Sequence, residues 1–164
     1  MNAAEIIKEL NLTLHPEGGY YKEIFRAEET IDEKSLPPRY YGNRCLSTSI
    51  YFLLEKNQVS KFHRLKSTEI WYYHYGCPLT LHMIDTNGNY SKIILGGNIQ
   101  KGEVFQAIIP VGAWFGAEAN DKNSFTLTGC NVAPGFDFKD FELGDRNYLI
   151  NNFPQHKEVI IRLT

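Results

Sequence analysis

The sequence predicts an all-β fold, either a barrel or a two-sheet sandwich, for three reasons. Segments rich in β-branched and aromatic residues follow one another from residue 45 to residue 133. Turn signals separate them at roughly eight to twelve residues, the spacing typical of such folds. Aromatic residues, which favour strands, make up 13% of the chain. With 164 residues the chain has the size of one domain, so we expect residues 1–164 to form a single unit with its own core.

Short helices are predicted at the two ends of the chain. Asn2 can cap a helix over residues 3–12, where apolar residues recur at helical spacing. Asp145 can cap a second helix over residues 146–152, which Pro154 would end. The apolar last residues are expected to pack back on the body of the protein.

The strands are predicted between these helices. A proline and two glycines within residues 15–19 end the first helix, and residues 20–26 form the first strand. Residues 27–43 are polar and contain two adjacent prolines, so we expect a long loop. The sequence Asn-Gly-Asn at residues 87–89 is a strong hairpin signal. The other predicted strands span residues 46–54, 59–62, 68–75, 79–85, 90–95, 104–109, 113–117 and 125–132.

The composition argues against several classes of function. The net charge is −2 and no cluster of Lys or Arg is present, which argues against a nucleic-acid partner. No apolar run approaches the ~20 residues of a membrane helix. Residues 1–14 lack the apolar core of a signal peptide. Cys45, Cys77 and Cys130 lie far apart, as in proteins with reduced thiols. We therefore expect a cytoplasmic protein without nucleic-acid or membrane partners.

The residues most able to carry chemistry are His63 and Glu69. Side chains alternate along a strand, so Glu69 shares one face with Trp71 and Tyr73. A carboxylate in an aromatic cavity is costly unless it has a partner, and His63 is a candidate six residues earlier. Such a pair could exchange protons with a ligand, bind a metal, or only satisfy each other.

Further residues are candidates for ligand contacts. Gln106 could offer an amide oxygen to an ion held by His63 and Glu69, since metal sites commonly use three or four protein ligands. The sequence identifies no cofactor with certainty, and a weakly bound divalent metal at these three residues is the one candidate. Arg44 could bind a carboxylate or phosphate, or pair with an acidic residue of the protein. The full set of expected ligand-binding residues is Trp71, Tyr73, Gln106, Trp114, Phe115, Arg44 and Tyr51.

Five motifs together resemble one known family. They are His15-Pro16-Glu17-Gly18-Gly19-Tyr20, residues 47–54, Phe62-His63-Arg64 with Glu69-Ile70-Trp71, Gln106 with Pro110, Gly112, Trp114 and Phe115, and residues 133–138. The chain resembles the cupin superfamily, and more narrowly a small single-domain cupin family of unknown function with this N-terminal motif. The resemblance implies a cupin-type double-stranded β-helix, or jelly-roll barrel, usually as a homodimer with a small-molecule pocket.

The chain departs from the general cupin pattern at two metal-ligand positions. Leu65 and Phe115 stand where that pattern has histidines. Three hypotheses follow. The first is a sugar or nucleotide-sugar isomerase or epimerase that uses His63 and Glu69. The second is a non-catalytic module that binds or senses a small ligand. The third is a metal-dependent cupin enzyme with a reduced ligand set. An exposed edge on the strand at residues 20–26 adds to the expectation of a homodimer.

Overall fold

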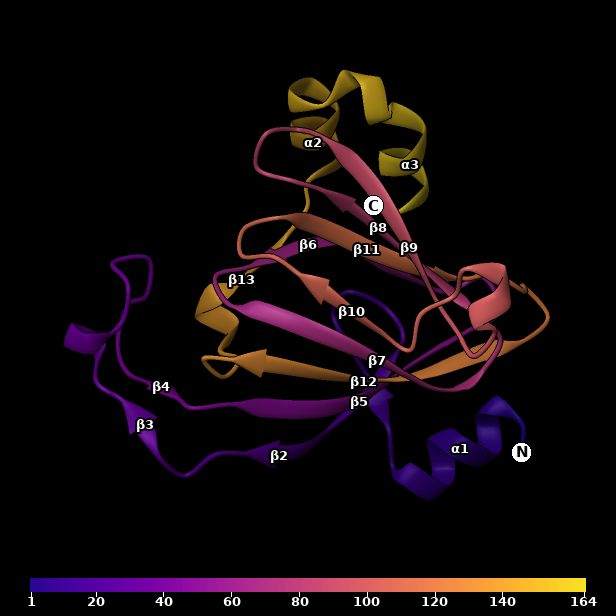
Figure 1. The fold of residues 1–164 in the computed structure, drawn as a ribbon, viewed down its shortest axis with the longest axis horizontal. Helices are drawn as coiled ribbons and strands as arrows, with labels where there is room; N and C mark the ends of the chain where they lie inside the picture. Colours follow the sequence, from indigo (N-terminus) through magenta and orange to yellow (C-terminus); the bar gives the residue numbers. More distant parts are fainter.

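The computed structural model describes all residues, 1–164. Two sheets face each other and form a barrel (Figure 1). One is six-stranded with the order β1-β2-β5-β12-β7-β10, and the other is five-stranded with the order β13-β6-β11-β8-β9. The strands are β1 (Thr13–Leu14), β2 (Tyr20–Arg26), β3 (Thr30–Ile31), β4 (Arg44–Cys45), β5 (Thr48–Glu55), β6 (Val59–Leu65), β7 (Thr68–Gly76), β8 (Leu79–Ile84), β9 (Tyr90–Leu95), β10 (Gln106–Ile109), β11 (Trp114–Ala119), β12 (Phe125–Ala133) and β13 (Phe141–Leu143). The all-β prediction is confirmed.

Helices lie at both ends of the chain, as expected. They are α1 (Ala3–Leu10), α2 (Arg146–Asn152) and α3 (Lys157–Arg162), with short 3-10 turns η1 (Glu33–Ser35), η2 (Ile99–Lys101), η3 (Phe138–Asp140) and η4 (Pro154–His156). Asn2 caps α1 through a capping box with Glu5, and Asn11 ends the helix in the left-handed conformation. Asp145 caps α2 by accepting the backbone N–H of Tyr148.

The long loop predicted at residues 27–43 contains the two-residue strand β3 and the turn η1. Together with β4 it forms an arm that projects from the barrel (Figure 1). Strands this short carry too few residues to show a period, so the sequence could not reveal β1, β3, β4 or β13. The longer strands fall within a few residues of the predicted ranges, and β6 extends three residues further, to Leu65.

Three groups of buried side chains hold the elements together. The largest fills the barrel between the two sheets and includes Phe52, Trp71 and Phe115. A second group, around Trp114, joins the outer face of the five-stranded sheet to the C-terminal helices. A third packs α1 against the outer face of β5. None of the helices has the length and apolar character needed to cross a membrane.

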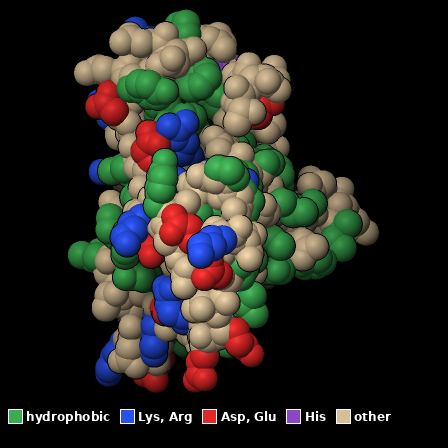
Figure 2. Space-filling view, turned by 90° about the vertical axis from the view of Figure 1, so that its left-hand side faces the viewer, with side chains coloured by type: hydrophobic (Ala, Val, Ile, Leu, Met, Phe, Trp, Pro, Cys, Tyr) green, Lys and Arg blue, Asp and Glu red, His purple; other side chains and the backbone are tan.

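Charges of both signs are mixed on the molecular surface. Figure 2 shows Lys and Arg side chains beside Asp and Glu side chains over the middle and lower part of one face. On that face the basic side chains do not gather into a stripe of the kind that tracks a nucleic-acid backbone.

The edge of β2 is only partly covered. β2 pairs with β5 along one side, whereas its other side pairs with β1 only at Tyr20 and Tyr21. The rest of that edge has no strand partner, and unpaired edges favour association with another strand. The homodimer expected from the sequence stays a prediction.

A buried ion pair joins β4 to the turn η3 before β13. Arg44 donates through Nε and Nη2 to the two carboxylate oxygens of Asp140, over 2.6 and 2.8 Å. Its Nη1 donates to the backbone carbonyls of Tyr41, Gly42 and Asn43. Both charged side chains are 3% exposed, so loss of either partner would leave an uncompensated charge in the interior.

We expect Asp140→Ala to lower the free energy of unfolding by about 3–5 kcal/mol, the usual cost of breaking a buried ion pair. The matched control is Glu142→Ala, which breaks the exposed Arg64–Glu142 pair and should cost less than about 1 kcal/mol. Urea denaturation of the three proteins measures both effects. Equal losses in the two variants would show that burial of the Arg44 pair has no special role.

Candidate functional site

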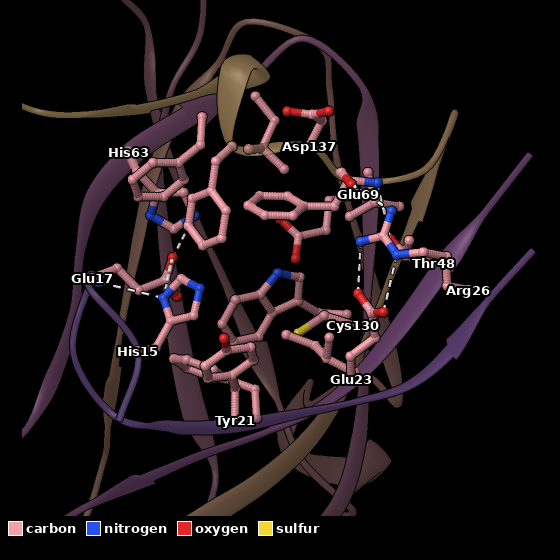
Figure 3. Close-up of a pocket in the computed structure, with 18 residues that line it drawn as sticks. His15, Glu17, Tyr21, Glu23, Arg26, Thr48, His63, Glu69, Cys130 and Asp137 are labelled. Atoms are coloured by element: carbon pink, nitrogen blue, oxygen red, sulfur yellow. Dashed lines mark hydrogen bonds and ion pairs between the residues drawn. The ribbon is translucent and has the colours of Figure 1, made fainter. Parts of the chain in front are cut away.

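One cavity opens into the barrel between the two sheets (Figure 3). Its volume is about 460 Å³, within the range of small-molecule sites. Strands β2, β5, β6, β7 and β12 and the segment around η3 supply its walls. The lining residues are His15, Glu17, Tyr21, Glu23, Arg26, Thr48, Ile50, Phe52, His63, Leu65, Glu69, Trp71, Cys130, Val132, Phe136, Asp137, Phe138 and Phe141.

The tight turn before β2 brings Glu17 into this cavity. Gly18 has a φ of +109°, and a Cβ there would lie 2.2 Å from the carbonyl oxygen of Val59, so only glycine fits. The backbone N–H of Lys61 donates to the carbonyl of Glu17 over 2.9 Å. This bond fixes the turn against β6 and places the Glu17 side chain beside that of His63.

Glu17 and His63 form a buried pair that shares a proton. Nε2 of His63 lies 3.1 Å from Oε2 of Glu17, and Ser60 Oγ donates to Oε1 over 2.9 Å. On its other side, Nδ1 of His63 lies 2.7 Å from the carbonyl oxygen of Lys61. A carbonyl only accepts, so Nδ1 carries the ring hydrogen. In the neutral ring Nε2 is then an acceptor, and Glu17 supplies the proton between them.

Burial explains why both members of the pair are neutral. It lowers the pKa of His63 to about 3 and raises the pKa of Glu17 well above its usual range. The nearby Glu69 carboxyl adds to the rise for Glu17, whereas the hydrogen bond from Ser60 opposes it. The nearby His15 is also neutral, because burial lowers its pKa to about 4. Its Nδ1 accepts the backbone N–H of Glu17 over 3.3 Å.

Glu69 lies on β7, on the sheet opposite His63. Burial raises the pKa of Glu69 to about 8, and the neighbouring Trp71 and Cys130 side chains oppose that rise only in part. Oε2 of Glu69 and Nε1 of Trp71 have no hydrogen-bond partner in the protein. The Trp71 indole N–H also lies close to the Glu69 carboxyl, where it opposes the rise in the Glu69 pKa, so the two groups form one polar spot in the wall of the cavity.

Arg26 and Glu23 lie together at one side of the cavity (Figure 3). Arg26 donates through Nε and Nη2 to the two carboxylate oxygens of Glu23, over 3.0 and 2.7 Å. Its Nη1 donates to the carbonyl of Phe136 over 3.1 Å. This last bond ties β2 to the aromatic segment that follows β12.

The structure brings three of the expected site residues together in the cavity: His63, Glu69 and Trp71. Tyr73 lies on the same face of β7 as Glu69 and Trp71, but further along the strand. It is half-buried there, and its hydroxyl donates to the carbonyl of Gly76. Gln106 is exposed on β10 and does not line the cavity. The expectation that Tyr73 and Gln106 contact the ligand is therefore corrected for this cavity.

Three further expected residues lie on other surfaces. Tyr51 faces α1 on the outside of β5, and Trp114 faces the C-terminal helices on the outside of β11. Arg44 is committed to Asp140 and to backbone carbonyls. Phe115 does point into the barrel, but it is fully buried behind the His63 ring, 4.0 Å between centroids, and supports that ring rather than lining the cavity.

Sequence reasoning missed His15 and Glu17 as site residues. Both lie in the short segment whose proline and glycines predict only the turn that ends the first helix. The signal was present, since two titratable residues stood within a turn that requires glycine.

The side chains in the cavity do not assemble the expected metal site. No group of three or more His, Cys, Asp or Glu side chains is arranged to hold an ion. Nε2 of His63 is directed at Glu17, and Gln106 lies outside the cavity. The set His63, Glu69 and Gln106 is thus not brought together as a metal site.

Comparison with solved structures finds the same fold over the whole chain. A protein from Shewanella oneidensis matches with 41% identity and a TM-score of 0.91, covering 100% of this chain and 98% of that one. A hypothetical protein from Leishmania major matches with 36% identity and a TM-score of 0.89, covering 100% and 99%. Oxalate decarboxylase from Bacillus subtilis is 18% identical with a TM-score of 0.56, covering 92% of this chain and 36% of its own. That last likeness shows the jelly-roll fold alone.

Sequence comparisons identify the family. An uncharacterised protein of Saccharomyces cerevisiae is 29% identical over 146 residues, which is 83% of this chain and 72% of the yeast protein. A family model described as "Cupin superfamily (DUF985)" matches residues 4–144. Because this match covers most of the chain and the barrel has the jelly-roll topology, the chain belongs to the DUF985 family of the cupin superfamily.

Proposed function

We propose that the protein is an isomerase or epimerase that moves a proton beside the carbonyl group of a small sugar-like compound bound in the cavity. The observation that carries the proposal is the buried Glu69 carboxyl, which lines the cavity with Oε2 unpaired and a pKa of about 8. Strongly shifted pKa values in a cleft are typical of groups that transfer protons. At neutral pH this carboxyl is mostly protonated and acts as an acid.

A ligand carbonyl oxygen would satisfy both unpaired groups at once. Trp71 Nε1–H and the protonated Glu69 each offer a donor beside the cavity. Donors fixed in a dry site stabilise negative charge that develops on such an oxygen. Glu69 and Trp71 therefore orient the carbonyl and promote loss of a proton from the neighbouring carbon.

The Glu17–His63 pair would receive that proton. A shift of the shared proton from Glu17 Oε2 to His63 Nε2 leaves a Glu17 carboxylate, which accepts the proton as the C–H bond breaks. The electron pair of that bond forms the enol double bond, and the carbonyl oxygen takes the proton of Glu69. The pair gains one positive charge and Glu69 one negative charge, so the cavity's net charge is unchanged. Return of a proton to the other face, or to the adjacent carbon, gives an epimer or an isomer.

Solvent-exchange NMR tests this proposal. Incubation with uncharged ketoses in D2O should replace the hydrogen next to the carbonyl by deuterium, which removes its proton signal. Glu17→Gln keeps the size and neutrality of the side chain but cannot pass on a proton. It should slow the exchange at least about a hundredfold, the lower end of general acid–base effects.

The matched control is Glu158→Gln on α3, an exposed change of the same chemistry that should exchange like the unaltered protein. Unchanged exchange in Glu17→Gln would refute the assigned base. Binding of ketoses without any exchange would instead identify a non-catalytic binding or sensing module.

A further inference from the structure

We infer that the cavity takes an uncharged polyhydroxylated carbonyl compound and rejects its phosphorylated and nucleotide-linked forms. This inference rests on the proposed function and names the substrate class of the same site.

The cavity lining contains a single permanent cation, Arg26, and no lysine. Proteins hold phosphates with several Arg or Lys side chains, or with backbone N–H groups at a helix N-terminus. The turn η3 beside the cavity has only three residues, and Asp137 caps it by accepting the backbone N–H of Lys139. Its first turn therefore offers a carboxylate, and not free donors, to an incoming anion.

The guanidinium of Arg26 is already committed. Its Nε and Nη2 both donate to Glu23, and its Nη1 donates to the carbonyl of Phe136. A ligand phosphate could reach two N–H groups of Arg26 only by displacing the Glu23 carboxylate or another acceptor. The other arginine near this end of the barrel, Arg44, is equally engaged with Asp140.

Acidic groups outnumber this one cation in the lining. Glu17, Glu23, Glu69 and Asp137 all contribute to the cavity wall. Glu17 and Glu69 are buried, and their raised pKa values keep them mostly neutral. Glu23 offsets Arg26, and Asp137 adds a further negative charge that repels an anion.

The buried groups suit hydroxyl and carbonyl oxygens. The unpaired Nε1–H of Trp71 and the Glu69 carboxyl can donate to a carbonyl or hydroxyl. His15 uses Nδ1 as an acceptor, so its Nε2 carries the ring hydrogen and adds a donor to the wall. Aromatic rings of Phe52, Phe138 and others form the rest of the surface. Neutral donors beside aromatic faces are the usual means of binding a sugar-like ligand.

The test uses pairs of probes that differ by one phosphate group. They are D-fructose with D-fructose 6-phosphate, and dihydroxyacetone with dihydroxyacetone phosphate, with inorganic phosphate as a separate probe. The readout is the indole N–H signal of Trp71 in proton–nitrogen NMR spectra of the full chain. The chain has two tryptophans, so loss of one signal in Trp71→Phe assigns it.

We expect the uncharged member of a pair to shift this signal with a Kd at least about tenfold lower than its phosphate, because like charges disfavour association. Inorganic phosphate should leave the signal in place. Glu23→Gln removes a negative charge and frees the Arg26 guanidinium, so it should reduce the preference for the uncharged member. Glu158→Gln should keep that preference.

Binding of the phosphates that is tighter than or equal to that of the uncharged members would overturn the inference. So would a shift of the Trp71 signal with inorganic phosphate, or the absence of a shift with all four ketose probes. The proposed function has its own readout. Binding of an uncharged ketose without deuterium exchange would support the inference and refute the isomerase. Deuterium exchange that is faster for the phosphates than for the uncharged ketoses would support the isomerase and refute the inference on substrate class.

Discussion

Replacement of Glu69 by glutamine is expected to abolish solvent exchange while the ligand still binds. Glu69 is mostly neutral at pH 7, so Glu69→Gln preserves charge, size and a hydrogen-bond donor beside Trp71. An amide can donate to the ligand carbonyl but cannot give up its proton to an enol. We therefore expect exchange to fall by about 10²–10⁴-fold, the usual contribution of one general acid. The Kd of the ketose should change far less.

The two readouts separate the roles of this side chain. Deuterium exchange measures proton transfer, and the shift of the Trp71 indole signal measures binding. Loss of both in Glu69→Gln would make Glu69 a binding residue only. Retention of both would remove it from the mechanism. Glu158→Gln, exposed on α3, controls for any general effect of replacing a glutamate.

The sequence predicted much of the fold because strand alternation and turn signals are local. The strands β2 and β9 and the helix α2 have the predicted bounds. The same local pattern could not tell which face of β11 turns inward. The register pairs Phe115 with His63, so Phe115 shares the inner face and Trp114 faces outward to the C-terminal helices. That pairing depends on a contact between distant segments.

The site was only half predictable for the same reason. His63 and Glu69 stand close in sequence on consecutive strands, β6 and β7, which lie in opposite sheets of the barrel, and their spacing indicated a shared location. The partner of His63 is instead Glu17, which a glycine turn brings against β6. Likewise, Arg44 pairs with Asp140, 96 residues away. Such contacts follow from the topology, which the sequence pattern did not specify in detail.

The free energy of unfolding is expected to fall as the pH rises toward 8, because the buried Glu69 carboxyl loses its proton. Its pKa rises from an ordinary 4.5 to about 8 on folding, so the folded protein binds more protons than the unfolded chain between these values. The stabilising contribution of Glu69 is fully present below pH 4.5 and is lost once the pH passes about 8. At about 1.4 kcal/mol for each pH unit, the total loss is on the order of 5 kcal/mol.

Glu69→Gln cannot ionise and should not show this loss. Urea unfolding at a series of pH values gives the free energy of unfolding of both proteins. The value for the variant minus the value for the unaltered protein should increase from pH 4.5 to pH 8. The interval from pH 6.5 to 8 is the clearest, because the lowered pKa of His63 affects stability only below its ordinary value of 6.5. Glu17 is common to both proteins, so the part of its contribution that does not depend on the Glu69 charge cancels in the difference. Parallel curves for the two proteins would mean that Glu69 is ionised in the folded state, and the proton donor of the proposed reaction would then be missing at neutral pH.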